Sequence, residues 1–342
     1  MEERYQTKLN IKNIKKVELI LATLPSYVED YFISLETLTT TLTRLNYARD
    51  IDLFFNYLKE YIFFKEKNEI TLNDIEKLTS TNIEKYLSFL TVYDLEGKTY
   101  MNSEKGKARK LASLRSMFKY LFNKDLLSKN ITTKVSTPKI RTKEIIKLEV
   151  DEIPKILNQV ENPCNLSTKQ QSFNKHTSKR DLAILTLFLG TGIRVSELVG
   201  LNISDIDFNN NAFKITRKGG NQTVLYFSEE VKNALNNYIK QRLENDKAKD
   251  ESALFLSLQN KRISVRAVEK LVKKYASVTT PLKKISPHKL RSTYGTNLYH
   301  ETKDIYIVAD VLGHKDVNTT KKHYASISDD IRRDAANKVI LR

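Results

Sequence analysis

Six polar residues suited to phosphate chemistry are spread through the C-terminal half of the chain. Two are arginines, one is a lysine, two are histidines and the last is a tyrosine: Arg194, Lys218, His288, Arg291, His314 and Tyr324. Two planar guanidinium groups from separate elements can bind the two non-bridging oxygens of one phosphate. The set therefore predicts a site that holds a phosphate diester while a phenol oxygen attacks phosphorus, provided that folding brings these side chains together.

The surrounding sequence predicts the elements that present these groups. Arg194 follows a Gly-Thr-Gly break, at the start of a helix whose N-terminus favours an anion. Pro287 suits the first turn of another helix, which places His288 and Arg291 on one face. Lys218 lies in an Arg-Lys-Gly-Gly turn between two predicted short strands. Separate elements thus supply the cations, so the site depends on the folded domain.

Other residues near these motifs are expected to serve the scaffold. Glu197 lies three positions after Arg194 and is expected to pair with a basic neighbour. His300 and His323 are expected at the surface or in packing. A zinc site built from the histidines is rejected, because the chain has one cysteine, Cys164, and no metal-ligand spacing.

The chain is strongly basic for its length. Its 342 residues include 58 lysines and arginines against 41 acidic residues, giving a net charge of +17 and a pI near 9.5. This balance favours a polyanionic partner, and nucleic acid is the leading candidate. No run approaches the roughly 18 apolar residues of a membrane span, and the beginning, MEERYQTK, lacks a signal-peptide pattern. We therefore expect a cytoplasmic protein.

The ordered motifs have a known counterpart. The strings that carry Arg194, Lys218, His288-x-x-Arg291, Leu-Gly-His314 and Tyr324 resemble the tyrosine recombinase (phage integrase) family over roughly residues 150–342. Within that family, the strings RDLAI and TRKGG look most like the Xer recombinases, particularly the solitary streptococcal type.

The resemblance implies a mainly α fold with a small antiparallel β-sheet. It implies a helical, SAM-like core-binding domain over residues 1–137, a basic linker over 138–147, and an α+β catalytic domain with a tail helix over 148–342. The length of the chain also favours two compact units.

The resemblance also implies a role for each motif residue. Tyr324 would attack the scissile phosphorus and form a 3′-phosphotyrosine. Lys218 would be the general acid for the leaving 5′ oxygen, and His288 would assist proton transfer at the tyrosine. The charge that develops on the phosphoryl oxygens would be stabilised by Arg194, Arg291 and His314. Neither a metal ion, ATP nor another cofactor is expected.

The first 130 or so residues are predicted to be helical, because apolar residues recur at helix spacing and glycine and proline are scarce. In one predicted helix, large residues at helical spacing are expected to face a core: Ile51, Phe54, Phe55, Leu58, Tyr61 and Ile62. Another spans about 103–123, with an apolar face formed by Leu111, Leu114, Phe118 and Leu121. Its polar face and the linker supply the predicted DNA contacts: Lys105, Arg109, Ser113, Lys139 and Arg141.

The second half is predicted to begin with a helix near 151–160, followed by a polar surface loop over 161–180 that contains His176. Short strands are expected over 205–227, with a further one possible near residue 255. Helices return from Glu229 to the end. The tail carries Ile331, Ala335, Val339 and Ile340 at helical spacing. The resemblance implies that this tail docks on a neighbouring subunit of a homotetramer on DNA, and packing on its own domain is the alternative.

Several functions share these features. The favoured one is a site-specific recombinase that exchanges strands of duplex DNA through a Holliday junction and resolves chromosome or plasmid dimers. Integration or excision of a mobile element is the alternative within the family. A sequence-specific DNA-binding protein without cutting activity needs no phenol, and a type IB topoisomerase needs no paired sites. We see no long N-terminal arm-binding module in the sequence, which favours dimer resolution, but many recombinases encoded by mobile elements are equally short.

Overall fold

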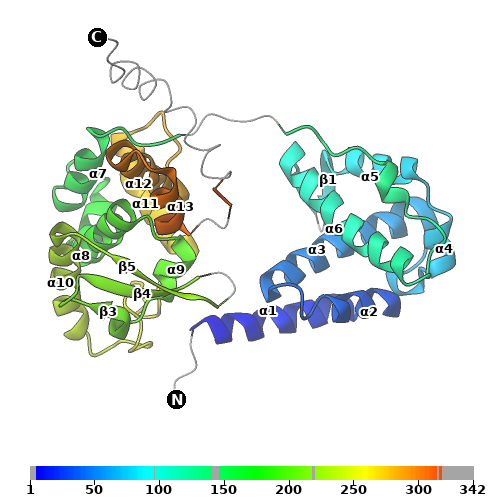
Figure 1. Ribbon diagram of the computed structural model, residues 1–342, viewed down its shortest axis with the longest axis horizontal. Coiled ribbons are helices and arrows are strands. Elements are labelled where there is room, and N and C mark those ends of the chain that lie inside the picture. The colour runs from blue at the N-terminus through cyan, green and yellow to red at the C-terminus, as the bar shows by residue number, and fades with distance from the viewer. Residues whose placement is uncertain (1–4, 96, 141–145, 218–219, 314–315, 318–342) are drawn as a thin grey trace, which may run out of the picture. The chain divides into compact units, whose positions relative to one another are not determined.

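The computed structural model describes residues 5–95, 97–140, 146–217, 220–313 and 316–317 (Figure 1). The chain divides into two compact units, Met1–Lys143 and Glu144–Arg342. In the described residues both units are mainly helical and each holds one small antiparallel sheet. The expected fold class is therefore confirmed.

The first unit packs its helices around one apolar core. Its helices are α1 (Tyr5–Leu21), α2 (Ser26–Ser34), α3 (Thr41–Leu58), α4 (Leu72–Glu76), α5 (Ser80–Phe89) and α6 (Glu104–Asn123). A π-helical turn spans Lys59–Phe63, and 3-10 turns span Lys67–Glu69 and Ile131–Lys134. Strands β1 (Val92–Leu95) and β2 (Lys98–Met101) form a hairpin.

The predicted apolar faces of α3 and α6 are confirmed. Both are buried in the core: Ile51, Phe54, Phe55 and Leu58 from α3, and Leu111, Leu114, Phe118 and Leu121 from α6. The sequence also predicts Tyr61 in this core, but Tyr61 is 54% exposed. It lies in the π-helical turn, whose wider spacing rotates side chains out of the α-helical register.

The first unit contains a hairpin that the sequence does not predict, and it extends past α6. The β1–β2 hairpin interrupts a segment that the periodicity predicts as helix, so that prediction is wrong over 92–101. Past α6, Ile131 and Val135 are buried in the first core, and Arg115 donates to the carbonyl oxygens of Thr132 and Val135. The first unit therefore extends at least to Val135.

The second unit combines helices with a three-stranded sheet. Its helices are α7 (Glu152–Glu161), α8 (Thr168–Thr191), α9 (Val195–Gly200), α10 (Glu229–Leu243), α11 (Val265–Thr279), α12 (Pro287–Thr302) and α13 (Ile305–Leu312). A 3-10 turn, Ile203–Asp205, leads into the strands β3 (Ile206–Asp207), β4 (Ala212–Thr216) and β5 (Gln222–Tyr226). The sheet order is β3-β4-β5, all antiparallel, with Phe213 opposite Leu225. The strands predicted over 205–227 are confirmed.

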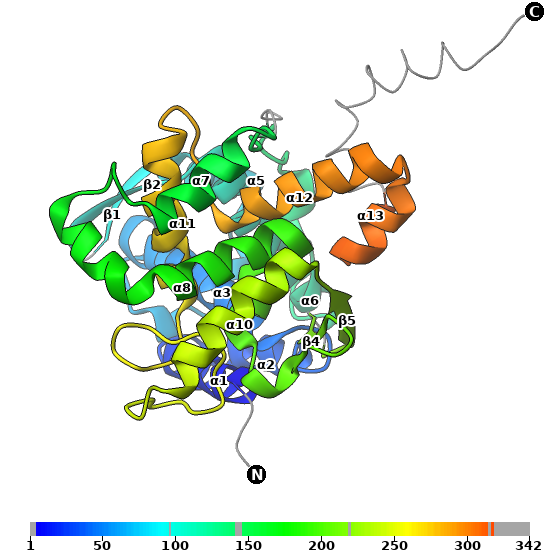
Figure 2. The same ribbon diagram turned by 90° about the vertical axis from the view of Figure 1, so that its left-hand side faces the viewer.

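Helix α8 is the centre of the second unit. It packs against α7, α10 and α12, and α13 packs against α12 (Figure 2). The α12–α13 contact is apolar: Val308 and Leu312 of α13 meet Tyr294 and Leu298 of α12. This packing sets the end of α8 beside the end of α13, which is where the candidate site forms.

The predicted surface loop over 161–180 is wrong, because α8 begins at Thr168. Ser167 caps the helix: its hydroxyl accepts from the Gln170 backbone N–H at 3.4 Å, and the Gln170 side chain accepts from the Ser167 N–H at 3.0 Å. Near residue 255 the described chain forms only isolated bridges, at Ala253 and Leu256, in place of a strand.

None of the described helices has the length and apolar character that a membrane span needs.

Candidate functional site

Arg194 is the N-cap of α9, and Glu197 holds it in place. The nearly buried Glu197 carboxylate accepts from the Arg194 backbone N–H at 2.9 Å and from Arg194 Nη1 at 2.8 Å. The predicted pairing of Glu197 is thus confirmed, with Arg194 itself as the partner. Arg194 Nη2 reaches away from α9 and donates to the carbonyl oxygen of Gly313 at 2.9 Å.

Arg291 joins the ends of two helices from inside the unit. It lies on α12 and is 6% exposed. Its Nη1 donates to the carbonyl oxygen of Gly192 at 2.5 Å, and its Nη2 donates to the carbonyl oxygen of Leu312. The structure therefore brings Arg194 and Arg291 together at consecutive carbonyl groups, directly before His314.

Two glycines make this convergence possible. Gly192 ends α8 with a φ of 62°, and Gly313 ends α13 with a φ of 61°, so both adopt the left-handed conformation that glycine tolerates best. A Cβ at Gly192 would lie 2.5 Å from Tyr294 Cδ1 and 2.9 Å from Leu312 Cδ2. The Gly-Thr-Gly break and the Leu-Gly-His string are therefore helix ends that bring backbone and side chains into close contact.

A third guanidinium, which is not among the residues predicted for the site, reaches the same helix end. Arg217 follows β4, and its Nη2 donates to the carbonyl oxygen of Val311 at 2.9 Å and its Nη1 to that of Asp310 at 3.4 Å. Burial lowers the pKa of Arg217, although the nearby Glu197 carboxylate opposes that shift. Its position next to Lys218 in the sequence is the signal that could have drawn attention to it.

Of the remaining predicted site residues, the structure describes only His288. His288 lies in the first turn of α12 and is exposed, whereas Arg291 on the same helix is buried. Lys218, His314 and Tyr324 lie outside the described residues, as does the predicted tail helix. Their chain neighbours Arg217 and Gly313 are described and lie in contact range of each other.

The described part of the site concentrates positive charge at a helix end. Helix C-termini carry partial negative charge and leave carbonyl groups without intrahelical partners, so they bind cations well. A guanidinium has five N–H donors, and Arg194, with about a third of its side chain exposed, keeps donors that can bind an anion. The arrangement suits a phosphate oxygen approaching Arg194 from solvent.

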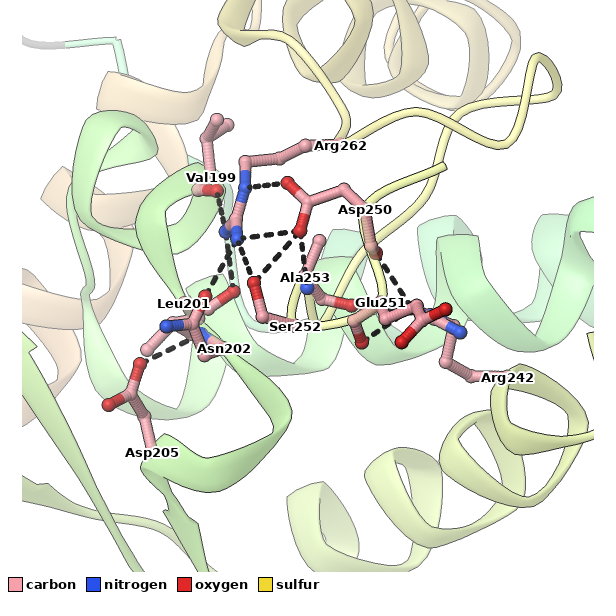
Figure 3. A network of polar contacts seen from close by, with 10 residues as sticks. All are labelled: Val199, Leu201, Asn202, Asp205, Arg242, Asp250, Glu251, Ser252, Ala253 and Arg262. Atoms are coloured by element: carbon pink, nitrogen blue, oxygen red, sulfur yellow. Dashed lines mark hydrogen bonds and ion pairs between the residues drawn. The ribbon is translucent and has the colours of Figure 1, made fainter. Parts of the chain in front are cut away.

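A second polar network fixes the far end of α9 (Figure 3). Arg262 Nη1 donates to the carbonyl oxygens of Val199 at 3.1 Å and Leu201 at 2.9 Å. Its Nη2 donates to Asn202 Oδ1 at 2.7 Å, and its Nε donates to Asp250 Oδ2 at 2.8 Å. The helix that starts at Arg194 is therefore held at its other end by the half-buried Arg262.

We expect Arg262→Met to destabilise the second unit by about 3–5 kcal/mol, because it leaves a carboxylate and several carbonyl groups without their donor. Urea unfolding of the full chain, together with hydrogen exchange of residues 195–202, measures the effect. Arg266→Met, at an exposed position of α11, is the matched control. Wild-type exchange in Arg262→Met would show that α9 does not depend on this network.

The pH dependence of the free energy of unfolding provides a second measurement on the same variant. Partial burial alone would raise the pKa of Asp250, but hydrogen bonds from Arg262 and Ser252 outweigh it and hold the pKa below its ordinary value. The contribution of Asp250 to the free energy of unfolding is therefore complete above about pH 4, and it is lost as the pH falls through the lowered pKa. In Arg262→Met, the free energy of unfolding should no longer fall as Asp250 becomes protonated.

The predicted DNA-contacting face of α6 is only partly exposed. Lys105 and Lys139 are exposed, and Arg141 lies outside the described residues. Arg109 Nη2 donates to the buried Asp50 carboxylate at 2.7 Å, so its guanidinium is already paired. Ser113 is fully buried and donates to Asp50 at 2.8 Å. The prediction that Ser113 lies on the outer polar face is therefore wrong.

Within the described ranges, no three His, Cys, Asp or Glu side chains form a group that could hold a metal ion.

Sequence comparisons relate most of the chain to known proteins. A model described as "Phage integrase family" matches residues 147–330. The tyrosine recombinase XerC of Caldanaerobacter subterraneus is 36% identical over 304 residues, covering 85% of this chain and 80% of its own length. The tyrosine recombinase XerS of Streptococcus gordonii is 31% identical over 354 residues, covering 95% of this chain and 98% of its own length. The XerS match spans both units.

Solved structures share the fold. The XerH site-specific recombinase bound to palindromic difH substrate aligns with a TM-score of 0.65 at 19% identity, covering 87% of this chain and 80% of that one. A lambda integrase dimer bound to a COC′ core site aligns with a TM-score of 0.60 at 16% identity, covering 87% and 94%.

Proposed function

Because the chain belongs to the phage integrase family of tyrosine recombinases, we propose that it is a site-specific DNA recombinase of the Xer type that cuts and rejoins DNA through Tyr324. The observation that carries this proposal is the meeting of Arg194 and Arg291 at the carbonyl groups of Leu312 and Gly313. Two guanidiniums from different helices are needed where one phosphate must be gripped and its developing charge stabilised.

The proposed reaction is a transesterification. The Tyr324 oxygen attacks the scissile phosphorus, its proton leaves with help from His288, and the bond to the 5′ oxygen breaks. Lys218 gives a proton to that leaving oxygen. The DNA is then joined to the protein as a 3′-phosphotyrosine, and attack by a 5′ hydroxyl from the partner duplex restores the diester.

Electrostatic stabilisation by Arg194, Arg291 and His314 supplies the main catalytic effect. Because the phosphotyrosine keeps the energy of the diester bond, rejoining needs no ATP. The cationic side chains take the part that a metal ion plays in other phosphoryl-transfer enzymes, so we propose a metal-independent reaction.

The proposed partner is duplex DNA that contains paired recombination sites. The net charge of +17 supports binding to the phosphate backbone. Lys105 and Lys139 remain candidates for such contacts because both are exposed. We propose a homotetramer on DNA in which the tail after Ser328 docks on a neighbouring subunit. Support comes from relatives bound to DNA sites, one of them a dimer.

For the biological role we propose dimer resolution in the manner of the Xer recombinases. The support is that curated relatives matching 80–95% of this chain are named XerC and XerS.

The test uses nicked duplexes taken from the neighbourhood of the coding gene, in which the short 5′ fragment diffuses away after cleavage. We expect a covalent protein–DNA adduct in EDTA and without ATP, a free 5′ hydroxyl on the released fragment, and a 3′-phosphate linked to Tyr324 by peptide mapping. If the protein bound every duplex tried but became covalently linked to none, it would be a DNA-binding protein without cutting activity, and the proposal would be refuted.

A further inference from the structure

Arg217 directly follows β4, the central strand of the sheet, and makes a contact far along the sequence. Its fork spans two successive carbonyl groups in the last turn of α13, those of Asp310 and Val311. Those carbonyls lie more than ninety positions later in the sequence. The contact therefore ties the β4–β5 hairpin to α13, which otherwise packs on α12.

The contact is tight and electrostatically costly. A Cβ at Gly313 would lie 1.2 Å from Arg217 Nη1, so a larger residue there would force this end of the guanidinium to move. Within the described part of the chain, Arg217 Nε is buried without a hydrogen-bond partner. Buried unpaired donors are rare and cost stability. A buried donor without a partner in a native structure calls for an explanation, and a functional role is one.

The position of Arg217 in the sequence suggests what it does. It directly precedes Lys218, and the helix end that it binds directly precedes His314. Arg194 and Arg291 donate to the next two carbonyls of the same helix end, those of Gly313 and Leu312. Arg217 thus connects the strand end that leads to Lys218 with the backbone that both arginines contact.

We propose that Arg217 is a positioning residue that holds the strand end before Lys218 against the end of α13, so that Lys218 can protonate the leaving 5′ oxygen. This inference rests on the proposed function. A lysine at position 217 would keep the charge but would reach one carbonyl at a time, whereas the arginine fork spans two.

The test compares two leaving groups. In one nicked duplex the scissile phosphate has its normal 5′ oxygen, and in the other this atom is sulfur. A thiolate leaves readily without a proton, so cleavage of the sulfur duplex needs no general acid. General acid catalysis is worth about a hundredfold to ten-thousandfold in rate. Single-turnover cleavage at saturating protein separates this effect from DNA affinity.

We expect Arg217→Ala to slow cleavage of the oxygen duplex by at least about tenfold and to cleave the sulfur duplex at the wild-type rate. Arg217→Lys should lie between wild type and Arg217→Ala on the oxygen duplex. Lys218→Ala should show the same selective defect. The double variant should be no slower than Lys218→Ala alone, because both changes remove one function.

Lys214→Ala is the matched control, since it removes one charge from an exposed position of the same strand. It should cleave both duplexes like wild type. Thermal unfolding of each variant verifies that the second unit is folded at the assay temperature.

Equal slowing of both duplexes by Arg217→Ala, or defects that multiply in the double variant, would overturn the inference. The inference would also fail if the wild-type protein were active and Lys218→Ala cleaved the sulfur duplex as slowly as the oxygen duplex. Lys218 would then not be the general acid. A wild-type protein that links to neither duplex would instead refute the proposed function itself.

Discussion

We expect Tyr324→Phe to form no covalent adduct with a nicked recombination site, at protein concentrations where the wild-type chain becomes linked to DNA. Phenylalanine keeps the ring but has no oxygen to attack phosphorus, so the proposed reaction has no nucleophile. Binding should persist, because it depends chiefly on contacts between cationic side chains and the phosphate backbone. Denaturing electrophoresis measures the adduct, and a mobility shift on the same samples measures binding.

Tyr306→Phe is the matched control for this variant. Tyr306 lies on α13 and is 71% exposed, so losing its hydroxyl should leave the adduct unchanged. An adduct that survives in Tyr324→Phe would show that another of the chain's 17 tyrosines, or another group, is the nucleophile. Loss of binding together with the adduct would instead give Tyr324 a structural role.

Local signals in the sequence were enough to predict many elements of the fold. The apolar faces of α3 and α6 follow the helical period, which depends only on residues a few positions apart. The helix ends at Gly192 and Gly313 follow from the backbone freedom of glycine. Pro287 begins α12 because its fixed φ suits a first turn.

The first half of α8 could not be predicted in this way, because its buried face is polar. Asn174, Thr177 and Asp181 are buried there, and the Tyr275 hydroxyl binds both Asn174 and Asp181. Lys274 adds an ion pair to Asp181 at 3.1 Å. Partners about a hundred positions away satisfy these polar groups, so the local pattern resembles a loop. The Ser167–Gln170 capping box was the local sign of a helix.

Ser113 and Arg217 show the same limit at the level of single residues. Ser113 lies on the polar side of α6 by spacing, but the buried Asp50 carboxylate of α3 turns that side into an internal contact. Arg217 resembles any basic residue of a hairpin until the chain folds and α13 ends beside it. In both cases the informative partner lies far along the sequence, so no window of neighbours reveals it.

Arg291→Ala should lower the single-turnover cleavage rate by at least about a hundredfold, because it removes a preorganised donor from the charge that develops on phosphorus. It should also destabilise the second unit by about 1–3 kcal/mol for each buried carbonyl left unpaired, at Gly192 and Leu312. The rate is therefore measured at saturating protein and at a temperature where thermal unfolding shows the variant to be folded.

Arg291→Lys separates the chemical effect from the structural one. A lysine at this buried position keeps the charge and can donate to one carbonyl, so part of the lost stability should return. The cleavage rate should stay low, because an ammonium group cannot satisfy both backbone carbonyls and the phosphate in the fixed geometry of a guanidinium. Arg266→Ala removes an exposed arginine of α11 and should leave the rate unchanged. If Arg291→Lys regained stability and rate in parallel, Arg291 would serve to join α8 to α13, and Arg194 would be left as the guanidinium that binds the phosphate.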